Sequence, residues 1–278
     1  MCIRDRSYIE SIVNGAQSNY NSMSAAVNKR FVNGLQFQAS YMWTRDLSDA
    51  QGYAPTAITT EGDSVSSDRF NLGLDYGNAS FDRRNRFLAT YLYELPFGKG
   101  KPFLHSGGAL NTVAGGWQLG GVVVLQSGAF LTPYQVTTDP GGTNLLSNAG
   151  STRADIVSGA PIYVRHQASG AGDPVFLNVN AFADPPNNSG GFGNAGVGNV
   201  VGPGTDSFSM SLIKSTALWE GATLNFGAEA ANVFNHRNYE TPDMNVDDGP
   251  TGFGIITALQ TAEGAGPRNI EITARVSF

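Results

Sequence analysis

The chain has 278 residues, of which 41% are hydrophobic and 14% are charged, and its formal net charge is −6. These values argue against a disordered chain, and the lack of a basic stripe argues against nucleic acid as a partner, because phosphates bind clustered Lys and Arg. Glycine accounts for 35 residues, well above its usual share of about 7%, which is typical of an all-β protein with long glycine-rich loops.

The first residues differ in character from the rest of the chain. Met1 to Arg6 resembles translated sequencing-adapter sequence, and we expect residues 1–17 to be a non-native or disordered leader. Residues 18–278 are then the folded part. No secretion signal opens the chain and no apolar run reaches the 18 or so residues of a spanning helix, so we expect the carboxyl-terminal fragment of a longer protein. The single cysteine, Cys2, argues against a disulfide framework and a thiolate metal site.

Seven strands of similar length are predicted along the chain. They lie at residues 18–30, 34–46, 81–95, 113–128, 205–218, 222–235 and 267–278. Each is long enough to cross a bilayer obliquely, for which about 9 to 11 residues suffice. The connections alternate between short ones and three long loops, at residues 47–80, 129–204 and 236–266. Short turns on one side and long loops on the other predict an all-β, antiparallel transmembrane outer-membrane β-barrel with about seven strands present.

Alternation within the strands predicts which side chains face lipid and which face the barrel interior. The residues expected on the lipid side or in the aromatic girdle are Leu35, Phe37, Tyr41, Trp43, Tyr91, Tyr93, Trp117, Trp219, Ile270 and Ile272. The residues expected to line the lumen are Gln36, Gln38, Arg86, Glu94, Glu229, Glu271 and Arg275. For any single aromatic residue, packing in a soluble β-sandwich is the alternative, but the loop alternation favours a girdle at the membrane interface.

The last strand carries the clearest pattern. Apolar and polar residues alternate from Pro267 to the carboxyl end, and the chain stops on an aromatic residue. We expect Val276 and Phe278 to form the assembly signal through which the barrel assembly machinery would bind this strand. Outer-membrane lipid is the partner expected along its apolar side.

Several motifs in this order also resemble a known family. They are Asn19–Met23, Asn33–Leu35, Tyr41–Thr44, Phe81–Phe87, Tyr93–Gly100, Gly116–Gly121, Gln126–Gly128, Phe192–Gly196, Gly202–Gly204 and Asn232–His236. They look like the barrel of TonB-dependent receptors, most closely the Oar-like subgroup, whose members often carry a carboxypeptidase-regulatory-like domain at the amino end. The resemblance implies a barrel of about 22 strands with a separate plug. It also implies contact with TonB through a segment preceding this chain, and import of an unidentified small-molecule, glycan or peptide substrate.

Motifs for catalysis or cofactors compete poorly with this interpretation. Gly191–Gly196 satisfies G-x-G-x-x-G but lacks the strand-then-helix context of a dinucleotide site, so we predict no cofactor and no enzyme activity. Asp243, Asn245 and Asp247 are candidate calcium ligands, although a solvated acidic loop is the alternative because the glycine comes one position late. The long loops show no recognisable pocket motif, which leaves the substrate open.

The sequence therefore predicts the carboxyl-terminal barrel segment of a TonB-dependent outer-membrane receptor. Two alternatives remain at this point. One is a passive outer-membrane structural protein or adhesin, and the other is a secreted carbohydrate-binding β-sandwich.

Overall fold

The structure is a computed structural model that describes residues 14–49, 68, 70–104, 108–135, 139–143, 152–219 and 221–278. Most of the predicted leader, including Cys2, and the middle of the 47–80 loop lie outside the described residues.

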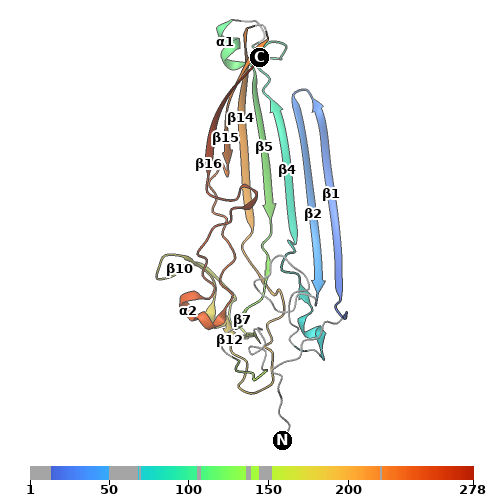
Figure 1. The fold of residues 1–278 in the computed structure, drawn as a ribbon, viewed down its shortest axis with the longest axis vertical. Coiled ribbons are helices and arrows are strands. Elements are labelled where there is room, and N and C mark those ends of the chain that lie inside the picture. Colours follow the sequence, from blue (N-terminus) through green and yellow to red (C-terminus); the bar gives the residue numbers. More distant parts are fainter. Residues whose placement is uncertain are drawn as a thin grey trace.

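One long antiparallel sheet dominates the described part of the chain (Figure 1). Its long strands, in sequence order and in spatial order alike, are β1 (Ser18–Val32), β2 (Leu35–Ser48), β4 (Asn85–Glu94), β5 (Trp117–Gln126), β14 (Thr205–Trp219), β15 (Ala222–Ala231) and β16 (Asn269–Ser277). The short β3 (Gly77–Asn78) adds to the end of β2. The seven predicted strands are confirmed, and each pairs with its sequence neighbour in an up-and-down meander.

The short connections lie at one end of this sheet. Between β1 and β2, Asn33 (φ 56°) and Gly34 (φ 80°) both adopt left-handed backbone conformations, as the hairpin turn with the matching twist requires. The connection from β4 to β5 contains α1 (Ala109–Ala114), so the strand expected from residue 113 begins only at Trp117. No described helix is long and apolar enough to cross a membrane.

The long connections gather at the opposite end and fold into a second structure. We call this structure, formed by the described residues of the connections 129–204 and 236–266, the cap. Its elements are β6 (Phe130–Leu131), β7 (Tyr134–Gln135), β8 (Thr152–Arg153), β9 (Asp155–Ile156), β10 (Tyr163–Ala168), β11 (Pro174–Leu177), η3 (Val179–Ala181), β12 (Phe182–Ala183), β13 (Val200–Val201), η4 (Val246–Asp248), α2 (Gly249–Gly252) and η5 (Ala262–Gly264). The strands pair in twos, β6 with β13, β7 with β8, β9 with β12 and β10 with β11. Beside the cap, η1 (Leu72–Asp75) belongs to the connection between β2 and β4.

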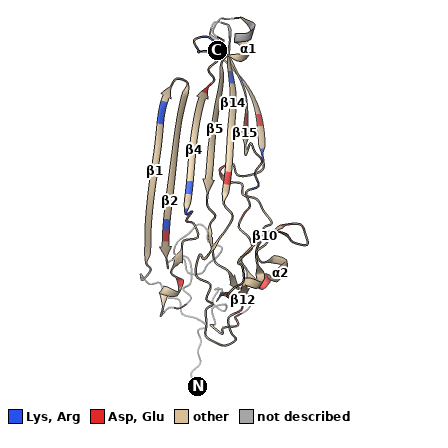
Figure 2. Ribbon diagram, turned by 180° about the vertical axis from the view of Figure 1, so that it is seen from behind, with Lys and Arg blue, Asp and Glu red and all other residues tan. Residues whose placement is uncertain are grey.

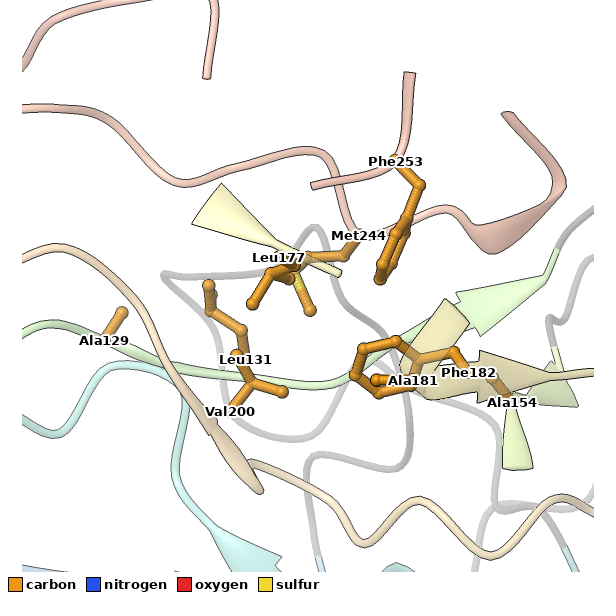
Figure 3. Close-up of a cluster of buried hydrophobic side chains, with 9 residues drawn as sticks. All are labelled: Ala129, Leu131, Ala154, Leu177, Ala181, Phe182, Val200, Met244 and Phe253. Carbon is orange, nitrogen blue, oxygen red and sulfur yellow. The ribbon is translucent and has the colours of Figure 1, made fainter. Parts of the chain in front are cut away.

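The cap has a hydrophobic core of its own (Figure 3). Side chains from both connections meet there, and the buried members are Ala129, Leu131, Ala154, Leu177, Ala181, Phe182, Val200, Met244 and Phe253. The rings of Phe182 and Phe253 pack edge to face, with centroids 5.2 Å apart. Burial of these groups, rather than extended strand pairing, holds the two connections together.

Candidate functional site

The pairing register divides the long strands into an apolar face and a polar face. Directly paired residues of antiparallel strands project to the same side, so the register assigns each side chain to a face. The members of the apolar face are Met23, Val27, Leu35, Phe37, Tyr41, Trp43, Phe87, Tyr91, Tyr93, Leu119, Val123, Leu125, Phe208, Met210, Leu212, Leu224, Phe226, Ile270, Ile272 and Val276. Trp117 pairs with Lys214 on this side, and Trp219 pairs with Ala222 after a register shift.

Much of the apolar face is exposed. Ile272 is 70% exposed and Ile270 59%, although both are fully apolar. An exposed apolar surface that spans a whole sheet marks contact with another apolar phase. In Figure 2 the Lys, Arg, Asp and Glu residues of the long strands lie mostly toward the strand ends, and β5 has none along its whole length. The sheet thus carries a band of uncharged residues across its middle.

The opposite face, which we call the polar face, collects most of the polar side chains, together with a few apolar ones such as Leu88, Leu92 and Val124. Gln36, Gln38, Arg86, Glu94, Glu229, Glu271 and Arg275 all project to this side. Glu229 pairs directly with Glu271, and Arg275 with Asn225. The register therefore separates the predicted lumen-lining residues from the predicted lipid-facing ones, while the solvent that each face meets stays a prediction.

A polar network on this face attaches the cap to the sheet. The Arg86 guanidinium donates to Gln126 Oε1 (2.9 Å), and the Gln126 amide donates to Thr205 Oγ1 (3.1 Å). Thr205 in turn donates to Gln260 Oε1 (2.6 Å), and Arg86 also forms an ion pair with Glu263. Gln260 and Glu263 belong to the 236–266 connection. Their bonds to the strand residues therefore hold this part of the cap over the ends of β4, β5 and β14.

A second network surrounds Asp82, which is buried just before β4. Its carboxylate accepts hydrogen bonds from the Thr44 hydroxyl and from the Asp46 amide (3.2 Å). Nearby, Arg84 donates to Asn78 Oδ1 (2.7 Å) and lies 4.9 Å from the centre of the Phe130 ring. The sequence motif Phe81–Phe87 therefore joins the ends of two strands to the cap.

The motif Asn232–His236 ends β15 in a comparable way. Asn232 is fully buried at a φ of 47° and donates to the carbonyl oxygens of His236 (2.7 Å) and Gly266 (2.8 Å). Its own side-chain oxygen accepts from the His236 amide (2.9 Å). This left-handed residue explains why the strand expected to reach residue 235 ends at Ala231.

The cap also contains a cleft of about 820 Å³. It lies between the tip of the β10–β11 hairpin and α2, and its floor includes Leu131, Tyr134 and Met244. Its lining combines hydroxyl groups (Ser169, Thr251) and carboxylates (Asp173, Asp243) with apolar groups. Sequence reasoning missed the cleft, because its walls come from segments that no local motif connects.

A scan against protein families matches residues 3–271 to the outer membrane beta barrel domain. The chain belongs to the outer membrane beta barrel domain family. No curated protein and no solved structure matches it. The protein is accordingly located in the bacterial outer membrane and associates with its lipid.

Membership in this family fixes the orientation of the barrel sheet. Outer-membrane barrels place short turns in the periplasm and long loops outside the cell, so the β1–β2 turn and α1 are periplasmic and the cap is extracellular. The long strands form a single layer, which excludes the β-sandwich alternative.

At the periplasmic end of this barrel sheet, two residues of the apolar face bind the end of α1. Lys214 Nζ donates to the carbonyl oxygens of Thr112 (2.7 Å) and Gly115 (2.7 Å), and Trp117 Nε1 donates to Val113 O (3.0 Å). The last carbonyls of a helix lack intrahelical partners, so a cation and a ring N–H are well suited to them.

The candidate calcium ligands of this outer-membrane barrel make local hydrogen bonds. Asp243 Oδ1 accepts from the Asn245 amide (2.9 Å), and Asn245 Oδ1 accepts from the Asp247 amide (3.3 Å) at the start of η4. Within the described part of the chain, no three His, Cys, Asp or Glu side chains gather as a metal site. Calcium binding by Asp243, Asn245 and Asp247 stays a prediction.

The acidic groups beside the cleft affect one another. Burial and the neighbouring Asp248 carboxylate raise the pKa of Asp243 above its usual value of 3.8. Burial, together with the charges of Asp243 and Asp248, raises the pKa of the Tyr134 hydroxyl. This part of the extracellular cap is therefore electronegative and costly to ionise further.

Proposed function

We propose that this chain is the barrel portion of a TonB-dependent, Oar-like outer-membrane receptor, and that its extracellular cap captures a nutrient for import. The observation that carries the proposal is the cap itself. It has a packed core and a cleft, and it is held against the polar face of the sheet through Arg86 and Glu263. A folded extracellular cap directly above a polar barrel interior is the arrangement that substrate capture and passage require.

The family resemblance supports the same proposal. Phe81–Phe87 and Asn232–His236, which resemble motifs of TonB-dependent receptors, form the junctions between strands and cap. Residues at these junctions would hold the substrate-binding loops in register with the barrel. TonB would supply the energy for import through a segment outside this chain.

A passive structural barrel or adhesin is the competing function, because it would have the same two-faced sheet. Deletion of this gene and deletion of tonB in the same host distinguish the two. We expect both deletions to abolish growth on the same limiting nutrient from a panel of single nutrients. Normal growth of the gene deletion on every nutrient, with loss of surface attachment or envelope integrity, would favour the passive role.

A further inference from the structure

The cleft of the cap has two walls that come from distant parts of the chain. One wall is the tip of the β10–β11 hairpin, which includes Ser169 and Asp173, and the other is α2 with the residues after it. Figure 1 shows this hairpin projecting beside α2. Main-chain hydrogen bonds fix its base, from Phe176 N to Gly254 O (2.7 Å) and from Ile256 N to Pro174 O (3.0 Å). These main-chain hydrogen bonds therefore hold the two walls of the cleft in fixed positions.

The tip of the β10–β11 hairpin is ordered by hydrogen bonds within the hairpin. Ser169 N donates to Asp173 O (2.8 Å), and Asp173 N donates to Ser169 Oγ (3.1 Å). These bonds use main-chain atoms of Asp173 and leave its carboxylate without a hydrogen bond to any described residue. The carboxylate is half-buried on the wall of the cleft, where it can receive a ligand group.

Acidic groups occur on both sides of the cleft. Asp173 lies on the hairpin and Asp243 lies on the segment leading to η4, while no Lys, Arg or His is among the described residues of the lining. Asp248 adds a third carboxylate next to Asp243. An anionic ligand would meet only repulsion here. Among the described lining residues a neutral glycan would find one aromatic ring, Tyr134, and it would leave the carboxylates uncompensated.

We propose that this cleft binds a basic ligand, such as a cationic peptide, whose ammonium or guanidinium groups are held between Asp173 and Asp243. The inference rests on the proposed receptor function and names the substrate class for it. Charge-assisted hydrogen bonds to the two carboxylates supply specificity. The hydroxyls of Tyr134 and Thr251 line the same space and can orient the rest of the ligand. The apolar floor at Leu131 and Met244 accommodates the aliphatic part of a Lys or Arg side chain.

The test is calorimetric titration of the full-length protein in detergent with trilysine, triglutamate and maltotriose. We expect trilysine alone to bind. Asp173→Asn and Asp243→Asn should each weaken trilysine binding about tenfold or more, because each removes one partner of a charge-assisted pair. Glu240→Gln is the matched control: it removes the same charge from the same connection but outside the cleft lining, and it should change affinity less than about twofold.

Three results would overturn the inference. They are binding of maltotriose in preference to trilysine, absence of trilysine binding, or equal effects of Glu240→Gln and the two cleft variants. Unchanged resistance of each variant to proteolysis within residues 129–204 and 236–266 confirms that its cap is folded, and Asp173 on the hairpin tip lies outside the buried core that contains Met244. Binding in detergent requires neither TonB nor transport. A failed growth test with intact trilysine binding would therefore contradict the proposed import and leave the ligand class standing.

Discussion

A single buried amide at Asn232 performs two tasks at the point where β15 ends. Its backbone, at a φ of 47°, ends the strand, and its side chain joins the chain on both sides of the 236–266 connection through His236 and Gly266. Asn tolerates the left-handed conformation better than most residues and offers both a donor and an acceptor. No other residue of similar size combines these properties.

Asn232→Ala should therefore destabilise the folded protein by about 3 kcal/mol, since it loses three hydrogen bonds in a buried site and keeps an unfavourable backbone. Asn235→Ala is the control. It shares the left-handed conformation (φ 53°) but loses only one exposed hydrogen bond, to Arg268 N (3.3 Å). Urea unfolding of the full-length protein measures both. Equal losses would show that the amide of Asn232 contributes nothing specific.

The Asp243 carboxyl predicts a pH dependence for the cap. Because burial and Asp248 raise its pKa above 3.8, the folded cap retains a proton that the unfolded chain has released. The contribution of Asp243 to the stability of the cap is therefore fully present below about pH 3.8, the usual pKa. It is lost as the pH rises through the higher pKa of Asp243 in the folded cap. Amide protection factors over residues 243–254, which are corrected for the pH dependence of intrinsic exchange, should rise when pH is lowered from neutral into the mildly acidic range. Asp243→Asn should remove this change, and persistence of the full effect in that variant would assign it to other groups.

At the scale of elements, the cap and the barrel strands are stabilised differently. The strands are held by main-chain ladders between neighbours, whereas the cap depends on a core drawn from both long connections. Phe253 is 1% exposed and packs on Phe182 in that core. Loss of cap packing should leave the strand ladders in place.

Phe253→Ala should cost the cap about 3–5 kcal/mol, because it creates a cavity in a buried core. We expect faster proteolysis within residues 129–204 and 236–266. The heat-modifiable band, which is the shift in gel mobility that a folded barrel shows on heating, should stay unchanged. Leu259→Ala, on the same connection but 37% exposed, should have a much smaller effect. Simultaneous loss of the heat-modifiable band in Phe253→Ala would show that cap and strands fold as one unit.

Gly128 illustrates a backbone approach that only glycine permits. A Cβ atom there would lie 1.8 Å from Gly202 O, at the point where the chain passes from β5 to the cap. Gly128→Ala should force the two segments apart and open the β6–β13 pair. Faster amide exchange at Gly202, whose N–H donates to Ala129 O (2.8 Å), measures this. Gly196→Ala, where the nearest atom would be 3.9 Å away, should leave that exchange rate unchanged. If the Gly202 amide exchanged as slowly in Gly128→Ala as in Gly196→Ala, the steric argument would be refuted.

The strands were predictable from sequence because apolar and polar residues alternate in Leu35–Trp43 and in Asn269–Ser277, and alternate residues of a strand lie on opposite faces of the sheet. The predicted start of β5 at residue 113 is wrong because the end of α1 is fixed by Lys214, some 100 residues later in the sequence. The cap and its cleft escaped prediction for the same reason. Two-residue strands have no periodicity, and Leu177 and Phe253 meet only after folding.

For the whole molecule, a single-layer sheet with one apolar and one polar face is unstable in water and well suited to a bilayer. Within the described residues, β1 and β16 form the edges of the sheet, and the apolar face runs continuously between them. Membership in the outer membrane beta barrel domain family supports the prediction that this face meets outer-membrane lipid. The cap adds an extracellular structure above the polar face, where the proposed capture takes place.

Paired substitutions in β16 test this account most directly. Ile272, on the apolar face, and Thr273, on the polar face, are neighbours in sequence and have the same depth in the sheet. Ile272→Lys should lower the stability of the bilayer-inserted full-length protein by about 2–4 kcal/mol, because a charge near the membrane midplane is placed in lipid. Thr273→Lys should cost less than about 1 kcal/mol, because water reaches the polar face. Equal costs, or a larger cost for Thr273→Lys, would contradict the assignment of the two faces.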